Sequence, residues 1–196
     1  MAATRRMGLE NSSSRAALMD GVEAVMREDG YAALTARSVA ERAGLKHQLV
    51  YYYFQTMDDL LMATYQRHIG RVQEQVEAAF RQPRPLHAFW DVCSNPHDAR
   101  LNMEFMAMAN HNAAIRAETI AFGESIRRVG LEQAAARIDA TPIGREMFSP
   151  FALTQAITAI GSTVGIEGAL GIQGGHDETR AMVQWWLARL EPESEG

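Results

Sequence analysis

Apolar side chains recur along most of the chain at the three-to-four-residue spacing of an amphipathic α-helix. In residues 12–29, for example, Leu18, Val22 and Val25 share one face, and Gly30 follows as a C-terminal stop. The same spacing predicts eight further helices, over residues 35–43, 46–53, 57–80, 87–94, 98–110, 113–138, 150–172 and 177–190. No segment has the alternation of a strand bounded by hairpin turns. The pattern therefore predicts an all-α protein of about nine helices.

Two short predicted helices flank a glycine turn in residues 35–54, T-A-R-S-V-A-E-R-A-G-L-K-H-Q-L-V-Y-Y-Y-F. Thr35 can cap the first helix, Ala40 is small where the helices cross, and Gly44 can adopt the positive φ of the turn. This is the layout of a helix-turn-helix, whose second helix enters the major groove of DNA. The side chains predicted to point outward from the second helix are Lys46, His47, Gln48, Leu49, Tyr51 and Tyr52.

This motif resembles the tetracycline-repressor (TetR) family of bacterial transcription regulators, through T-A-R-S-V-A-E-R-A-G-L, V-Y-Y-Y-F and the following Leu60 and Leu61. The resemblance implies three N-terminal helices that bind DNA and a fourth that links them to an effector and dimerisation domain. The roles that it carries over are phosphate contact by Arg37, base-edge contact by His47, Gln48 and Leu49, and backbone or base contact by Tyr51, Tyr52 and Tyr53. Met57 stands where the family usually has a phosphate-binding lysine, so that contact is expected to be absent.

Helix pattern and resemblance together divide the chain into a flexible tail (1–11), a helix-turn-helix DNA-binding domain (12–56) and a ligand-binding and dimerisation domain (57–196). Residues 1–56 hold seven Lys or Arg and six Asp or Glu, whereas the remaining residues hold twelve and eighteen. The overall net charge of -5 excludes a basic protein that coats nucleic acid. The nearly neutral first part still permits a local contact with double-stranded DNA.

The middle of the chain is rich in methionine and aromatic residues, and the whole chain has eleven methionines. Thioether side chains repack around varied apolar shapes, so they favour a site for a small, mostly apolar effector. No cofactor is expected. The predicted ligand-binding residues are Met62, Tyr65, Phe89, Trp90, Cys93, Met103, Met106, Asn110 and His111. The alternative is that most of these side chains form an ordinary core and that Asn110 caps a helix.

Glycines recur at helical spacing near the end of the chain, at Gly161, Gly165 and Gly168. Each glycine costs a helix about 1 kcal/mol relative to alanine, and close approach by a second helix would explain this cost. Beside them lies an apolar stripe, and the last helix is also apolar. The pattern predicts a homodimer in which the last two helices of each chain form the interface, through these glycines and Leu153, Ile157, Ile160, Val164, Met182, Trp185 and Trp186.

Together these features predict a ligand-responsive transcriptional regulator without enzymatic activity: a repressor that a small effector releases from a palindromic operator. One alternative is a metal- or cysteine-dependent enzyme that uses a cluster around the break at Pro96, comprising His87, Asp91, Cys93, His97 and Asp98. The other alternative is a DNA-binding protein without an effector.

Three features of the sequence predict a cytoplasmic protein outside the membrane. The single cysteine cannot form an intrachain disulfide, which favours a reducing compartment. The N-terminus lacks the apolar stretch of a secretory signal. The longest weakly charged stretch, Ser149–Gly175, is too polar to cross a bilayer.

Overall fold

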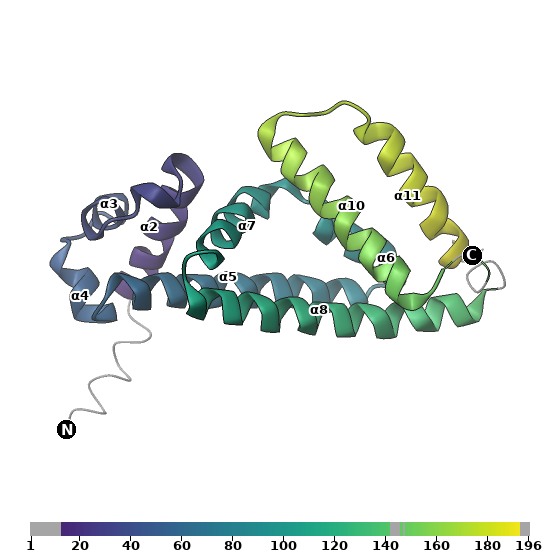
Figure 1. Cartoon of the computed structure of the whole chain (residues 1–196), viewed down its shortest axis with the longest axis horizontal. Coiled ribbons are helices and arrows are strands. Elements are labelled where there is room, and N and C mark those ends of the chain that lie inside the picture. Colours follow the sequence, from purple (N-terminus) through teal and green to yellow (C-terminus); the bar gives the residue numbers. More distant parts are fainter. Residues whose placement is uncertain (1–12, 142–145, 147, 193–196) are drawn as a thin grey trace, which may run out of the picture. The chain divides into compact units, whose positions relative to one another are not determined.

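Figure 1 shows the computed structural model of the chain, which describes residues 13–141, 146 and 148–192. These residues form nine α-helices and one short 3-10 helix, with no strand among them, which confirms the all-α prediction. The elements are α2 (Ser13–Asp29), η1 (Tyr31–Ala33), α3 (Ala36–Arg42), α4 (Gln48–Phe54), α5 (Met57–Phe80), α6 (Pro85–Cys93), α7 (Pro96–Ala109), α8 (Ala113–Ala140), α10 (Pro150–Leu170) and α11 (His176–Leu190). The predicted flexible tail lies outside the described residues.

Proline explains why the predicted starts of two helices were wrong. The predicted helices 87–94 and 98–110 begin earlier, at Pro85 and Pro96. From the sequence, Pro96 is expected to interrupt the helix. Proline is instead well suited to the first turn of a helix, where its missing N–H would have no partner. The η1 turn was not predicted.

The chain forms two compact units. One comprises Met1–Gly70 with Leu101–Thr119, and the other comprises Arg71–Arg100 with Ile120–Gly196. We call them the N-terminal unit and the C-terminal unit. Their division falls inside α5, α7 and α8, so the N-terminal unit contains parts of these helices as well as the helix-turn-helix. The predicted functional boundary between residues 56 and 57 stays a prediction.

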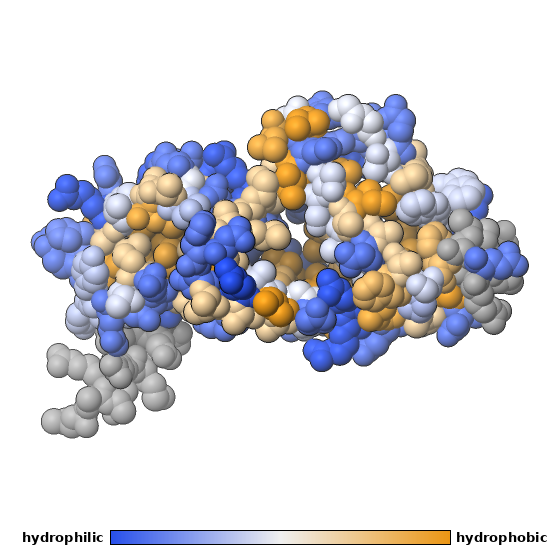
Figure 2. Space-filling model, viewed as in Figure 1, coloured by the Kyte–Doolittle hydropathy of each residue, from blue (hydrophilic) through white to orange (hydrophobic). Residues whose placement is uncertain are grey.

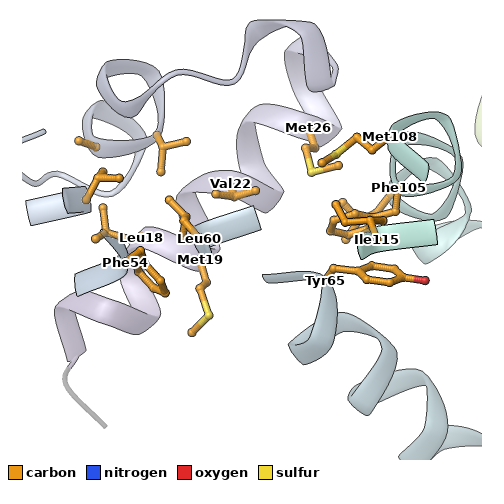
Figure 3. Close-up of a cluster of buried hydrophobic side chains, with 14 of the residues drawn as sticks. Leu18, Met19, Val22, Met26, Phe54, Leu60, Tyr65, Phe105, Met108 and Ile115 are labelled. Carbon is orange, nitrogen blue, oxygen red and sulfur yellow. The ribbon is translucent and has the colours of Figure 1, made fainter. Parts of the chain in front are cut away.

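A single cluster of buried apolar side chains, the N-terminal core, holds the N-terminal unit together (Figure 3). Met26 of α2 points toward Met108 of α7, and the ring of Tyr65 lies 4.8 Å from that of Phe105, centroid to centroid. The helix-turn-helix and α7 are therefore packed on one shared core. Its buried members are Leu18, Met19, Val22, Met26, Val39, Ala40, Val50, Phe54, Leu60, Tyr65, Leu101, Phe105, Met108, Ala109 and Ile115.

In the C-terminal unit, α6 packs against α10 and α11 around a second buried cluster. Its members are Val76, Leu86, Phe89, Trp90, Ala134, Ile138, Leu153, Ile157, Val164, Val183, Leu187 and Leu190. The carboxylate of Glu191, which directly follows α11, is only 2% exposed and accepts hydrogen bonds from the backbone N–H groups of Leu86 and His87, at 3.0 and 3.2 Å. His87 Nδ1 lies 2.9 Å from it, and Arg137 Nε donates to it at 3.2 Å. These contacts fasten α6, α8 and the end of α11 together.

The glycines of α10 face the end of α6 and the residues that follow it in the same chain. A Cβ added to Gly161 would lie 2.7 Å from Cβ of Cys93, and one added to Gly165 would lie 3.4 Å from the carbonyl oxygen of Asn95. The close approach that the sequence analysis assigned to a second chain therefore occurs within one chain. This part of the predicted interface is corrected, because helical periodicity shows that a face is buried and not which helix buries it.

The other members of the predicted interface differ in how far they are exposed. Leu153, Ile157 and Val164 are buried within the chain, which removes them from a surface that a second chain can reach. Ile160 and Trp186 are half-buried against the second cluster. The members that remain exposed are Gly168, Met182 and Trp185.

Replacing Gly21 with alanine is expected to destabilise the N-terminal unit. A Cβ at Gly21 of α2 would lie 2.5 Å from the carbonyl oxygen of Val39 on α3, a backbone atom that moves only if a helix moves. Gly70→Ala is the matched control, because its Cβ would meet no atom within 4 Å. The control is expected to raise the stability by about 0.5–1 kcal/mol, since it removes the entropic cost of a helical glycine. Thermal melting followed by circular dichroism compares the two variants. A Gly21→Ala variant that melts as high as Gly70→Ala would contradict this packing.

Candidate nucleic-acid interface

The first helix of the helix-turn-helix, α3, begins with a reciprocal cap. The side chain of Thr35 accepts a hydrogen bond from the backbone N–H of Ser38 at 3.0 Å, and Ser38 Oγ accepts one from the N–H of Thr35 at 3.0 Å. This capping box satisfies two N–H groups that a helix start leaves without partners, and it confirms the predicted capping role of Thr35. On the inner face, Val39 and Ala40 are buried in the N-terminal core.

The turn between α3 and α4 depends on glycine, as predicted. Gly44 has a φ of +64°, a left-handed conformation that other residues adopt with strain. The N–H of Leu45 donates to the carbonyl oxygen of Ala40 at 2.8 Å, and that of Gly44 donates to the carbonyl oxygen of Glu41 at 3.1 Å. This pair of bonds is a Schellman motif, which ends α3 and directs the chain into α4.

The α4 helix has one buried and one exposed face. Val50 and Phe54 are buried in the N-terminal core, and the guanidinium of Arg15 lies over the ring of Phe54, 4.8 Å from its centroid. On the other face, the side chains of Tyr51 and Tyr52 are 52% and 57% exposed, and Gln48 is exposed as well. A glutamine amide can bind adenine through two hydrogen bonds, and tyrosine hydroxyls reach phosphates. These three side chains have the chemistry and exposure that DNA contact requires.

Four other predicted contact residues lie at the ends or the side of this face. Lys46 and His47 are exposed but precede α4, which begins at Gln48 rather than at residue 46. Leu49 and Tyr53 are half-buried and pack against the N-terminal core, so Leu49 does not point fully outward as predicted. The reason is the helical repeat, because positions 49 and 53 are one turn apart on the side next to Val50. Arg37 is exposed on α3.

Most carboxylates of the DNA-binding domain belong to α2 and none to α4. The α4 helix contains no charged side chain, while α2 carries four carboxylates that are held in ion pairs with two arginines. These pairs join Arg42 to Glu28 and Asp29, and Arg67 to Asp20 and Glu23. Because these acidic groups are partly neutralised on α2, repulsion of DNA phosphates at the exposed face of α4 is reduced.

The start of α5 contains a feature that the sequence analysis missed. Thr56 Oγ1 accepts from the N–H of Asp59 at 3.0 Å, and the Asp59 carboxylate accepts from the N–H of Thr56 at 3.2 Å. The T-x-x-D spacing is the signal that predicts such a capping box. Between them, Met57 is half-buried against the N-terminal core, at the position where the resemblance expects lysine.

Comparison with family models decides the identity of this part of the chain. Residues 18–64, which span α3, α4 and parts of α2 and α5, match the model described as bacterial regulatory proteins, tetR family. These residues form a TetR-family domain. This helix-turn-helix is therefore the DNA-binding domain of a transcriptional regulator.

Solved TetR-family structures share the fold. A TetR transcription regulator from Haloarcula marismortui has a TM-score of 0.69 at 18% identity, over 89% of this chain and 96% of that one. A regulator from Rhodococcus sp. has a TM-score of 0.68 at 15% identity, over 90% and 98%. The fatty acid degradation regulator FadR from Bacillus halodurans has a TM-score of 0.62 at 14% identity, over 94% and 98%. A comparison with curated proteins found no match in sequence.

The predicted ligand-binding residues are divided between the two units. Met62, Tyr65, Met103, Met106, Asn110 and His111 belong to the N-terminal unit, whereas Phe89, Trp90 and Cys93 belong to the C-terminal unit. Phe89 and Trp90 are buried members of the second core cluster, and Met106 is 62% exposed, with Asn110 and His111 exposed as well. Apolar periodicity does not distinguish a core residue from a ligand contact, and the assignment of these residues to one effector site stays a prediction.

The cysteine near Pro96 is held as a thiol. Burial raises the pKa of Cys93 to about 12, and a hydrogen bond with Thr158 offsets this only in part. The thiolate, which is the nucleophilic form, is therefore scarce at neutral pH. Among the described residues, no three His, Cys, Asp or Glu side chains come together as metal ligands. In the same part of the chain, no helix has both the length and the apolar character needed to cross a membrane.

Removing either of two exposed α4 side chains is expected to weaken specific DNA binding. Gln48→Ala and Tyr52→Ala each remove a predicted base or phosphate contact, and one good base contact contributes about 1–3 kcal/mol of discrimination. Gel-shift titrations with the preferred duplex of the wild type and with a scrambled duplex measure this. Gln75→Ala is the control, because Gln75 is exposed on α5. Wild-type affinity in both α4 variants would show that this face does not contact DNA.

Proposed function

We propose that the chain is a homodimeric repressor that binds a palindromic operator and leaves it when a small, mostly apolar effector binds. The observation that carries the proposal is the exposed face of α4, on which Gln48, Tyr51 and Tyr52 project from a helix fixed by its buried side. A pair of such domains related by a two-fold axis would contact successive major grooves, about 34–36 Å apart. An inverted repeat of two half-sites matches that symmetry.

The exposed side of α11 supports the proposal of a dimer. Met182 and Trp185 are 42% and 48% exposed, and the guanidinium of Arg189 lies 3.4 Å from the centroid of the Trp185 ring. Leu170, the last residue of α10, and Ile172, which follows it, are 63% and 49% exposed. Figure 2 shows hydrophobic residues at the surface near the segment that joins α10 to α11. Large exposed apolar side chains favour an interface with another protein surface. We assign the dimer interface to this exposed side of the last two helices, in place of the buried glycines.

Side chains of the N-terminal unit support the proposal that an effector binds there. Met62 and Met103 are half-buried, and Tyr65 is buried with its hydroxyl 2.7 Å from Thr119 Oγ1. Burial raises the pKa of Tyr65, so its hydroxyl stays neutral and can give or accept a hydrogen bond. Flexible thioethers and a neutral hydroxyl within one unit suit an apolar ligand with a polar end. Fatty acids and hydrophobic drugs have this chemistry and serve as probes.

Selection from a pool of random double-stranded DNA tests the function. The wild-type protein is expected to enrich an inverted repeat whose half-site centres are one helical turn apart, about 10 base pairs. Adding members of a panel of fatty acids and hydrophobic drugs to the purified complex is then expected to release the duplex. Failure to enrich any sequence would overturn specific DNA binding. Enrichment without release by any probe would favour a DNA-binding protein that has no effector of this class.

A charge at Trp185 is expected to separate the dimer. Trp185→Glu places a carboxylate in the proposed interface, where the second chain would have to bury it without a partner. Ile120→Glu on α8 is the matched control, because Ile120 is 60% exposed and lies outside the proposed interface. Sedimentation measures the oligomeric state of both variants, and gel shift measures their affinity for the selected duplex. A monomeric, weakly binding Trp185→Glu variant supports the assignment, whereas a dimeric one refutes it.

A further inference from the structure

A carboxylate on α7 binds the backbone just before the helix-turn-helix. One oxygen of Glu104 accepts a hydrogen bond from the N–H of Tyr31, at 2.8 Å, although the two residues are 73 positions apart in sequence. Tyr31 is the first residue of η1, and both residues belong to the N-terminal unit. The first N–H of a helical turn has no partner within the turn, so this carboxylate acts as an N-terminal cap supplied by another helix.

Hydrogen bonds link η1 to the start of α3. Within η1, the N–H of Leu34 donates to the carbonyl oxygen of Tyr31 at 3.1 Å. Ser38 Oγ, which belongs to the capping box of α3, donates to the carbonyl oxygen of Ala33 at 2.8 Å. A continuous series of bonds therefore connects Glu104 to the N-terminal turn of α3.

The backbone that carries Glu104 is firmly held. The neighbouring side chains Leu101, Phe105 and Met108 are buried in the N-terminal core, with at most 5% exposure. Glu104 itself is half-buried, which limits competition by water for its hydrogen bond. The position of its carboxylate therefore helps to determine the positions of η1 and α3.

We propose that Glu104 is a positioning residue for operator recognition, acting through η1 and α3 without touching DNA. The proposal rests on the proposed function, because it concerns the specific complex. Base contacts require accurate placement of α4, whereas contacts between mobile side chains and phosphates tolerate small displacements. Loss of the Glu104 carboxylate therefore reduces specific affinity and leaves non-specific affinity nearly unchanged.

Three substitutions separate positioning from a general effect on the fold. Glu104→Ala removes the acceptor, while Glu104→Gln keeps a carbonyl oxygen in the same place. Glu118→Ala is the matched control, because Glu118 is another carboxylate of the N-terminal unit and accepts from the side chain of Gln66 at 3.2 Å. Glu104→Ala is expected to bind the selected duplex about five- to tenfold more weakly, since it loses a hydrogen bond to a charged group. Glu104→Gln and Glu118→Ala are expected to stay within about twofold of the wild type.

Two further measurements make the outcome decisive. All variants are titrated with a scrambled duplex, and their melting temperatures are measured. If Glu104→Ala loses specific and non-specific affinity equally and also melts at a lower temperature, the positioning role is overturned. Exchange of the Tyr31 amide hydrogen, followed by NMR without DNA, is expected to be faster in Glu104→Ala than in the wild type. Unchanged exchange overturns the proposal even if the wild type selects no duplex. If the wild type selects a duplex and Glu104→Ala binds that duplex with unaltered affinity, this inference is refuted and the proposed function stands.

Discussion

Burial of the apolar face of α2 is the interaction on which the DNA-binding part of this protein depends. The α3 and α4 helices have seven residues each, and isolated helices shorter than about 12–15 residues are marginal in water. They persist because Val39, Val50 and Phe54 are buried in the same core as the apolar side chains of α2. The direction of the exposed Gln48, Tyr51 and Tyr52 is thus a consequence of packing on the opposite side of α4.

Local sequence signals were sufficient for the features that are themselves local. Helical periodicity predicted the all-α class and most helix ends, and the types of Thr35 and Gly44 predicted a cap and a turn that the structure confirms. Features that join distant segments were not predictable in this way. The glycine face of α10 was recognised as a close contact, but its partner was misassigned, because Cys93 and Gly161 are brought together only by the fold. The bond between Tyr31 and Glu104 likewise has no sequence signature, since neither residue type is restricted to that role.

Each compact unit uses a carboxylate that is distant in sequence to satisfy N–H groups at the start of a short helix. In the C-terminal unit, Glu191 accepts from Leu86 and His87 at the start of α6, and Arg137 balances its charge. In the N-terminal unit, Glu104 does the same for η1. Burying a carboxylate is costly unless it is hydrogen-bonded or paired, and the partial positive charge of a helix start lowers that cost. Such caps fix the position of short elements that contribute little buried apolar surface of their own.

This arrangement links the position of α7 to that of the helix-turn-helix. Leu101, Phe105 and Met108 bind α7 to the N-terminal core through apolar contacts, and Glu104 binds the backbone of Tyr31 from the same helix. If α7 shifts, η1 must follow it or the hydrogen bond must break, and a bond to a charged group contributes about 1.5–3 kcal/mol. A ligand that displaces α7 without moving η1 must therefore bind the displaced state more tightly by at least this free energy. If η1 instead moved with α7, the bond would survive and α3, which is bonded to η1 through Ser38, would have to change position with it, so the Glu104 carboxylate would couple a shift of α7 to the DNA-binding surface.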